Sequence, residues 1–518
     1  MRSPRRAGLF LVLFATAICA SSASATPRHP DVSSLNKNSR EIFLTSMQWA
    51  DKYYDAQARL VAAPPASVYS EELHVPQHFP AHLMVRESTW YALGLLLRDG
   101  KGDRERAADI LRVVLDQQYH EPGKVWDGTF RRTPAEPEPG ANAVMWRAYD
   151  PNWREFVGTT LAIVLLEYPD RIPAELRPRM IQAIDDAVAG ETKQGRLAPT
   201  YTNPALMYGF LWSFAAERGG RPEWRTEAQK WQDTVYGLYK QHDAFFEFNS
   251  PTYAGVDFFA LALWRDYGFT KQMRARGEEM EAGLWRATAD LYNANLRNIS
   301  GPYDRSYGMD MQSYVSVTGV WLRTVLDADH APLTGFDNTP VDHVDDLFFV
   351  PPIAVLDTRI PPDAMKSFTS FQGEHQVRRP IADERIATAW IGKELIYGGE
   401  ITGHTKDVDA HSQFHPVTVQ WQAPGKIGWI QLTRCPMIDA SADRNGIVIS
   451  ANGDVSFRIS APGLTAASAQ SAQWTLPNLT VHIDTDAKNF TAQQQGSFVD
   501  VTYTALTRMT LTFTSTGE

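Results

Sequence analysis

The spacing of apolar residues changes near residue 345 of this 518-residue chain, and that change limits the folds open to it. Before this point apolar residues recur every three or four positions, the period of amphipathic helices. Beyond it they form short runs, rich in β-branched and aromatic residues, that are separated by turn signals. We therefore expect two domains, a helical domain followed by an antiparallel β-sandwich.

The helical half contains about ten segments with the helical period. The expected helices are 41–60, 84–98, 104–118, 153–167, 174–189, 204–216, 225–240, 253–266, 272–297 and 311–326.

The second half follows a segment rich in Asp and Pro, 333–364, which we expect to be a linker between domains at 26–332 and 365–518. The dipeptides Asn445-Gly446 and Asn452-Gly453 favour tight hairpins. The expected strands are 386–391, 395–398, 417–421, 429–432, 447–450, 455–459, 479–483, 499–503 and 509–513.

The N-terminus has the pattern of a signal peptide. Three arginines precede an apolar run, 9–20, which closes on the small-residue sequence Ala23-Ser24-Ala25. We expect residues 1–25 to be removed and the protein to be secreted or periplasmic. Cys19 would leave with the signal, so Cys435 has no partner for an internal disulfide. No later run reaches the roughly 20 apolar residues of a membrane span.

The net charge argues against nucleic acid as a partner. The formal charge of −10 becomes −13 once the three arginines of the signal are removed. An acidic substrate stays open, because a cleft can be locally basic on a negative surface. The oligomeric state is not predicted.

Two short loops concentrate polar side chains around Gly and Pro. They are F-N-S-P-T-Y at 248–253 and G-P-Y-D-R-S-Y-G-M-D at 301–310. Loops of this composition direct polar groups into a cleft between helices, which indicates a catalytic site.

The order of a helical domain and a β domain, together with this site chemistry, resembles the (α/α)-toroid polysaccharide lyases, the group containing chondroitin, alginate and heparinase-type lyases. The resemblance implies an N-terminal toroid, either incomplete or a six-hairpin barrel. It also implies β-elimination beside the carboxylate of a uronic acid. That reaction needs a group that neutralises the carboxylate, a base and an acid.

The loop 301–310 supplies the preferred catalytic tyrosine, Tyr307. Arg305 beside it can bind the uronate carboxylate in a bidentate manner or lower the pKa of the phenol. The alternative is an ion pair of Asp304 or Asp310 that only holds the loop in place. Asp310 is also a candidate substrate contact.

Two helix entrances supply further candidates. Asn203, before Pro204, is the expected neutraliser, and the alternative role is an N-cap. Tyr253 is a base or acid candidate, or else a packed tyrosine with a wetted tip. Asn249 can contact substrate. Either Asn249 or Ser250 can cap the helix that Pro251 begins.

Substrate contacts are also expected upstream. Trp126 and Trp146 offer flat platforms for sugar rings, although most tryptophans of this half must belong to the core. Asn152 lies at a helix start, and Arg86 follows three histidines.

The β domain has a cluster of His and Asp at 404–415. Its His-x3-His spacing suggests a metal, but it lies in a loop and the chain has no H-E-x-x-H or paired-cysteine motif. We therefore expect no metal and no cofactor. In the resembling lyases a sheet-domain loop can lean over the cleft, which makes His404 or His411 a second base or neutraliser.

Two other functions stay open. A glycoside hydrolase would use a carboxylate pair, Glu247 with Asp310 or Asp150 with Asp304, separated by roughly 6.5–9.5 Å for inversion. A non-catalytic glycan-binding protein would use the same groove without a tuned tyrosine. We favour the lyase because both loops centre on tyrosine, arginine and asparagine.

Overall fold

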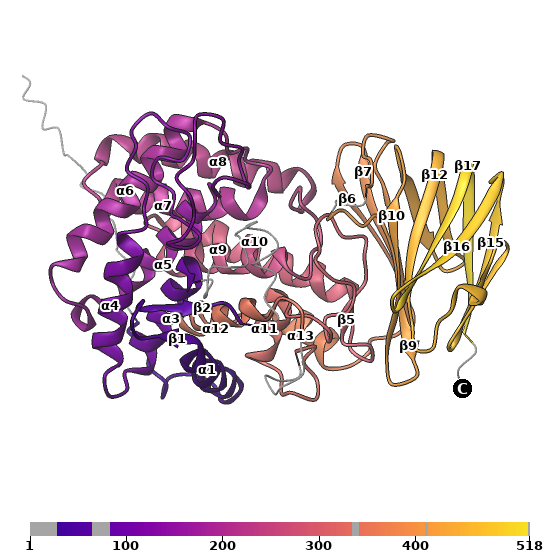
Figure 1. The fold of residues 1–518 in the computed structure, drawn as a ribbon, viewed down its shortest axis with the longest axis horizontal. Helices are drawn as coiled ribbons and strands as arrows, with labels where there is room; N and C mark the ends of the chain where they lie inside the picture. The colour runs from indigo at the N-terminus through magenta and orange to yellow at the C-terminus, as the bar shows by residue number, and fades with distance from the viewer. Residues whose placement is uncertain (1–27, 65–82, 334–340, 410–412, 516–518) are drawn as a thin grey trace, which may run out of the picture.

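A computed structural model describes residues 28–64, 83–333, 341–409 and 413–515. The first part is helical, the second is a large antiparallel sheet, and the two lie side by side (Figure 1). This order confirms the expected fold class. None of the helices in these ranges combines the length and apolarity that a bilayer crossing requires.

The helical part consists of α-helices joined mainly by short loops. Their bounds are α1 (Lys37–Ala50), α3 (Val85–Arg98), α4 (Asp103–Leu115), α5 (Trp153–Glu167), α6 (Leu176–Gln194), α7 (Thr202–Arg218), α8 (Arg225–His242), α9 (Tyr253–Tyr267), α10 (Lys271–Leu291), α11 (Val317–Arg323), α12 (Val350–Leu356) and α13 (Pro362–Thr369).

The helices of the described residues pair as hairpins, α3 with α4, α5 with α6, α7 with α8 and α9 with α10. The first helix of each pair packs on the first helix of the next pair and is buried over most of its surface. The second helix is amphipathic and covers the outside. Helix α12 packs on both α3 and α9 and fills the gap between the first and last pairs. With four helix pairs among the described residues, where a six-hairpin barrel has six, the helical part is an incomplete (α/α) toroid.

Three expected helices end early or begin late. The segment expected at 41–60 leaves the helix at Ala50 and forms short strands. The segment 272–297 ends at Leu291, because the Asn293 side chain accepts the Leu296 N–H at 2.9 Å and makes a turn instead. The helix expected at 311–326 begins only at Val317, which Ser316 caps.

The sheet part is antiparallel, with strand order β13-β14-β15-β17-β12-β10-β9-β8-β7-β6. Its strands are β6 (His375–Ala382), β7 (Arg385–Ile391), β8 (Leu395–Ile401), β9 (Val417–Ala423), β10 (Lys426–Arg434), β11 (Asp439–Asp443), β12 (Gly446–Ser460), β13 (Ala469–Gln470), β14 (Gln473–Leu476), β15 (Leu479–Thr485), β16 (Asn489–Gln495) and β17 (Phe498–Ser515). The helical part adds β1 (Tyr54–Asp55), β2 (Leu60–Ala62), β3 (Leu83–Met84), β4 (Tyr292–Asn293) and β5 (Asn298–Ile299).

A bulge at Gly453 replaces the hairpin expected at Asn452-Gly453. Gly453 has φ +144°, and the register with β17 shifts on both sides of it. Before the bulge β12 pairs with β11, and after it β12 pairs with β10, so one long strand serves both layers of the sandwich. The expected hairpin at Asn445-Gly446 joins β11 to β12.

The segment 333–364, which we expected to be a linker, contains helices in its described part. The 3-10 helix η4 (Val344–Phe349) and α12 pack against α3. Their apolar side chains belong to the helical core, which also includes Val377 and Ile391 of the first strands of the sheet. The two parts therefore share one core across their boundary.

Candidate active site

A cleft of about 780 Å³ opens where the inner helices begin. It is lined by the first turns of α5, α7 and α9, by loop 301–310 and by Gln413 of the sheet part. Each outer helix returns the chain, so the inner helices share one direction and their N-terminal ends meet. Residues singled out in the sequence line this cleft: Arg86, Trp146, Asn152, Asn203, Tyr253, Arg305 and Tyr307.

Two tyrosines face each other in the cleft. The hydroxyls of Tyr253 and Tyr307 are hydrogen-bonded, and their ring centroids are 5.5 Å apart. Ser250 Oγ accepts the N–H of Tyr253 at 2.8 Å and fixes the start of α9. The ring of Tyr307 stacks on His343 with centroids 4.2 Å apart. Since either hydroxyl can donate, one oxygen can carry a charge while the other keeps its proton.

Arg305 supplies a fixed positive charge beside this pair. Its Cζ lies 3.6 Å from the ring centroid of Tyr253, and its Nη1 lies 3.2 Å from Glu247 Oε1. Burial acts to lower the pKa of Arg305, but Tyr253 first and then other neighbours outweigh it and raise that pKa. The guanidinium thus acts on Tyr253 more directly than on Tyr307, which we expected it to tune.

Asn203 has an unused hydrogen-bond donor. It lies in the first turn of α7 and is 2% exposed. Its Nδ2 makes no hydrogen bond to any described residue. The N-cap interpretation is wrong, because Tyr201 holds the cap position and Glu247 Oε2 accepts the Thr202 N–H at 2.7 Å. An unpaired buried amide costs about 1–3 kcal/mol, which makes Asn203 a candidate ligand contact.

Asp150 and Glu247 are half-buried carboxyl groups of the cleft. Desolvation raises the pKa of each, and Arg305 offsets this only in part at Glu247. Asp150 Oδ1 accepts the Asn152 N–H at 2.9 Å, and Asn152 Nδ2 donates to the Tyr201 hydroxyl at 3.0 Å. Asn152 therefore ties the start of α5 to the start of α7.

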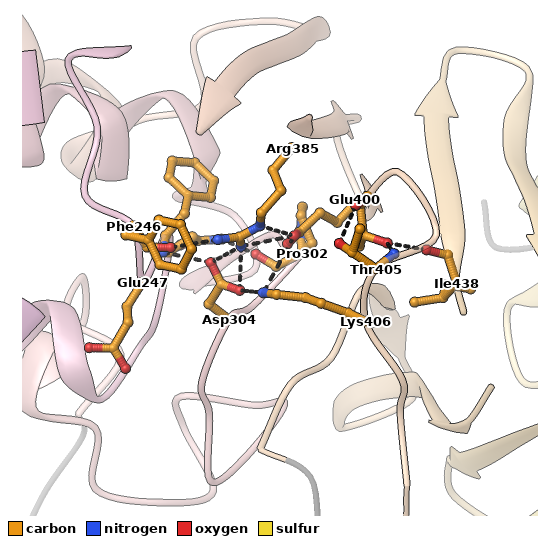
Figure 2. Close-up of polar contacts among 12 residues, drawn as sticks. Phe246, Glu247, Pro302, Asp304, Arg385, Glu400, Thr405, Lys406 and Ile438 are labelled. Atoms are coloured by element: carbon orange, nitrogen blue, oxygen red, sulfur yellow. Dashed lines mark hydrogen bonds and ion pairs between the residues drawn. The ribbon is translucent and has the colours of Figure 1, made fainter. Parts of the chain in front are cut away.

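The loop 301–310 is anchored by side chains of the sheet part (Figure 2). Asp304 is contacted by Arg385 Nη2 at 2.5 Å and by Lys406 Nζ at 2.6 Å. Arg385 also pairs with Glu400 at 2.8 Å and donates to the Phe246 carbonyl at 2.8 Å. Asp304 therefore forms an ion pair that ties the loop down, as the alternative interpretation of this loop expected, and its partners are Arg385 and Lys406 of the sheet part.

The sheet part also reaches the cleft through Gln413. Its Oε1 accepts from Arg305 Nε at 3.2 Å, and its carbonyl accepts the Ser306 N–H at 3.0 Å. Tyr303 and His415 exchange backbone hydrogen bonds at 3.0 and 2.8 Å. The position of Arg305 therefore depends on both parts of the molecule.

Three expected substrate contacts lie outside the cleft. Trp126 is 5% exposed and packs on Tyr149 in a small apolar cluster. Asn249 has φ +51°, and its Nδ2 donates to carbonyls of the neighbouring loop, Ser300 at 2.7 Å and Pro302 at 2.8 Å. Asp310 Oδ1 accepts from Asn298 Nδ2 at 3.0 Å. Asn249 and Asp310 therefore hold loop 301–310 in place on the side away from the cleft.

The histidine cluster is dispersed. His404 is exposed outside the cleft, with Nε2 3.2 Å from Asp439 Oδ2, and His411 lies outside the described residues. His415 is buried against the carbonyl of Ser306. No group of three or more His, Cys, Asp or Glu with metal-binding geometry occurs within the described ranges. The absence of a cofactor stays a prediction.

The carboxylate pairs considered for hydrolysis do not meet in the cleft. Asp304 is held by the sheet, and Asp310 is held behind the loop. Each pair thus has one member outside the cleft lining of the described residues.

Several cleft residues carried no local signal in the sequence. Trp90 lies inside an apolar helix, and His343 and Asp345 lie in the segment expected to be a linker. Gln413 lies in a sheet-domain loop. Their contacts span long sequence separations, which periodicity does not reveal.

Residues 40–358 match the model of a family described as a domain of unknown function (DUF8769). The chain belongs to this family. No curated protein matches the sequence.

Among solved structures, the chain is similar to heparinase III, with 8% identity, 95% of this chain and 88% of that chain covered, and a TM-score of 0.41. It is also similar to a mutant of heparan sulfate lyase HepC from Pedobacter heparinus, with 10% identity, 93% and 89% covered, and a TM-score of 0.31. Because these scores are below 0.5, the function proposed below rests on the residues of the cleft.

Proposed function

We propose that this protein is a polysaccharide lyase that cleaves a uronic-acid-containing polysaccharide by β-elimination. The observation that carries the proposal is the grouping in one cleft of an unpaired buried amide, Asn203, with the hydroxyl pair Tyr253–Tyr307 and the cation Arg305. These groups match the three roles that the elimination requires.

Asn203 and Arg305 are assigned to the substrate carboxylate. The unused Nδ2 of Asn203 donates to a carboxylate oxygen, and that bond strengthens as negative charge spreads from C5 onto the carboxylate. Arg305 adds a fixed cation whose orientation is set by Glu247 and Gln413. Losing one donor of this kind typically lowers kcat by about 10²–10³.

The tyrosine pair is assigned to proton transfer. The phenolate of Tyr253, favoured by the guanidinium on its ring, takes the proton from C5 of the uronate. The electrons of that C–H bond form the C4=C5 double bond while the bond from C4 to the leaving oxygen breaks. Tyr307 donates its proton to the leaving oxygen, and the shared hydrogen bond then returns a proton from Tyr253 to Tyr307.

The proposal includes an acidic polysaccharide or oligosaccharide as substrate and an exported protein, in keeping with the signal-like N-terminus. The elimination exchanges no electrons with an outside donor or acceptor, so no redox cofactor enters it.

The test follows ultraviolet absorbance of the unsaturated uronate product while the purified protein meets a panel of uronic-acid polysaccharides. Wild type should raise the absorbance on at least one polymer, and Tyr307→Phe should not. The matched control is Tyr236→Phe, because Tyr236 lies on the outer helix α8 with its hydroxyl on Glu279. This control should keep full activity.

Two results would contradict the proposal. New reducing ends without a rise in absorbance would indicate a hydrolase. Binding of a polymer without either product, unchanged in Tyr307→Phe, would indicate a glycan-binding protein.

A further inference from the structure

The arginines of the cleft differ in their partners. Among the described cleft residues, three arginines each contact a carboxylate: Arg86 with Glu87 at 2.6 Å, Arg132 with Glu136 at 2.5 Å, and Arg305 with Glu247 at 3.2 Å. Arg147 is exposed and has neither an ion pair nor a hydrogen bond from its guanidinium to any described residue. Its charge is therefore free for an incoming anion.

Trp146, next to it, presents an open aromatic face. Its side chain lines the cleft and is 48% exposed, unlike most large apolar side chains of the helical part. Its backbone has φ +63°, a conformation that is uncommon for bulky residues. An exposed indole on a strained backbone needs a reason, because neither feature stabilises the fold.

A buried ion pair holds this dipeptide in place. Arg132, which is 6% exposed, donates to the carbonyls of Trp146 at 3.1 Å and Arg147 at 2.8 Å, while Glu136 neutralises it. The Trp146 N–H also donates to the Tyr149 carbonyl at 2.8 Å. With these backbone groups fixed, the two side chains are presented by a rigid segment, and little ordering is lost on binding.

We propose that Trp146 and Arg147 form a second subsite that binds a sugar ring carrying its own acidic group. The indole stacks on the ring, and the guanidinium pairs with a carboxylate or sulfate oxygen of that sugar. This inference rests on the proposed function and narrows it: the substrate carries acidic groups on more than one sugar along the chain. The uronate that reacts is bound separately, by Asn203 and Arg305.

The test measures binding by calorimetry in the Tyr307→Phe background, so that no turnover occurs. The probes are a polyuronate oligosaccharide and the same oligosaccharide with its carboxyl groups reduced to alcohols. Arg147→Gln should weaken binding of the charged probe about tenfold and leave the reduced probe unchanged. It should also reduce the magnitude of the slope of log affinity against log salt concentration by about 1, as expected for the loss of one ionic contact.

Two further variants separate the roles. Arg147→Lys should restore part of the affinity for the charged probe, because it keeps the charge without the planar fork. Trp146→Ala should weaken the binding of both probes, since stacking on the indole does not depend on the charge of the sugar. The control Arg444→Gln makes the same charge change on an exposed arginine of the β11–β12 hairpin and should alter neither probe.

The inference is overturned if Arg147→Gln affects both probes equally or neither, or if the charged probe fails to bind the Tyr307→Phe parent. Its failure is distinguishable from failure of the proposed function. If wild type forms unsaturated product but Arg147→Gln has no charge-dependent effect on binding, the proposed lyase function is supported and the subsite is contradicted. If Arg147→Gln weakens binding of the charged probe alone but no polymer gives product, the subsite is supported and the proposed lyase function is contradicted.

Discussion

At the scale of single residues, the site contains groups whose placement opposes stability. Asn203 keeps a buried amide nitrogen without a partner in the described structure, and Trp146 exposes an indole on a strained backbone. Functional sites often hold such features, because selection for activity tolerates a local loss of stability.

Replacing Asn203 by Ala should therefore separate activity from stability. The change removes the unpaired donor, so the melting temperature should stay the same or rise, while kcat on the responsive polymer should fall by about 10² or more. The measurement combines thermal unfolding with steady-state kinetics.

The matched variant is Asn298→Ala. Asn298 is also buried, but its side chain bonds to Leu296, Asp310 and Met311, so its loss should destabilise the protein. A fall in melting temperature at Asn203→Ala equal to that at Asn298→Ala would contradict the interpretation.

His415 should make the protein sensitive to acid. Burial lowers the pKa of His415 from its ordinary 6.5 to about 4, opposed only by the Ser306 carbonyl. The unfolded chain binds a proton below pH 6.5 that the folded protein excludes, so unfolding becomes easier as pH falls. The stability from neutral His415 is complete above pH 6.5 and is lost between pH 6.5 and 4, about 3 kcal/mol in all.

This is checked by urea unfolding of wild type and His415→Gln between pH 4 and pH 8. The variant should lose less stability than wild type between pH 6.5 and 4. His482→Gln, at an exposed position on β15, should keep the wild-type pH dependence. Parallel curves for wild type and His415→Gln would contradict the prediction.

At the scale of elements, loop 301–310 is positioned by strands rather than by its own helices. Asp304 is held by Arg385 of β7 and by Lys406 beyond β8 (Figure 2). The same Arg385 holds the Phe246 carbonyl just before the loop 248–253. One guanidinium thus sets the distance between the loops that carry Tyr253 and Tyr307.

Breaking this contact should reduce kcat more than substrate affinity. Arg385→Met leaves Asp304 and Glu400 without their main cation, which should cost about 3–5 kcal/mol of stability. Lys406→Met is the milder variant, because Asp304 keeps Arg385. Arg385→Met and Lys406→Met should both lower kcat with a smaller change in KM. Lys406→Arg, which keeps the positive charge beside Asp304, should keep kcat close to that of wild type.

The comparison that identifies a positioning effect is Arg265→Met. Arg265 forms an equally buried pair with Glu281 at 2.6 Å, near the end of α9 that lies away from the cleft. Arg265→Met should destabilise the protein about as much as Arg385→Met, while kcat measured at a temperature below unfolding stays unchanged. Equal losses of kcat in Arg265→Met and Lys406→Met would show that only stability is involved.

At the scale of the whole molecule, the helical part and the first strands of the sheet share one apolar core. The helical core continues into Val377 and Ile391 of the sheet, and the cleft includes Gln413. Separating the parts would expose this apolar boundary to water.

We therefore expect a single main transition in calorimetry of residues 26–518. A fragment ending at Thr369, after α13, should unfold at a lower temperature and lack the proposed lyase activity. Two independent transitions, with the first matching the isolated fragment, would contradict a shared core.

The local sequence pattern was sufficient to predict the order of the two parts, most of the inner helices and the loops that carry the tyrosines. Helical and strand periods arise from contacts a few residues apart, so the sequence displays them directly. The same pattern did not reveal η4 and α12 within 333–364, which are stabilised by packing against α3.

Tertiary structure alone decided which polar residues meet. Tyr253 and Tyr307 are 54 residues apart, and Asp304 and Lys406 are 102 apart. Asn203 does not cap α7, because Glu247 from another loop accepts the Thr202 N–H at the start of that helix. The side chains of Asn249 and Asp310 form hydrogen bonds with backbone and neighbouring side chains outside the cleft. Such pairings depend on how the packed helices and sheet bring distant loops together, and local periodicity holds no record of that packing.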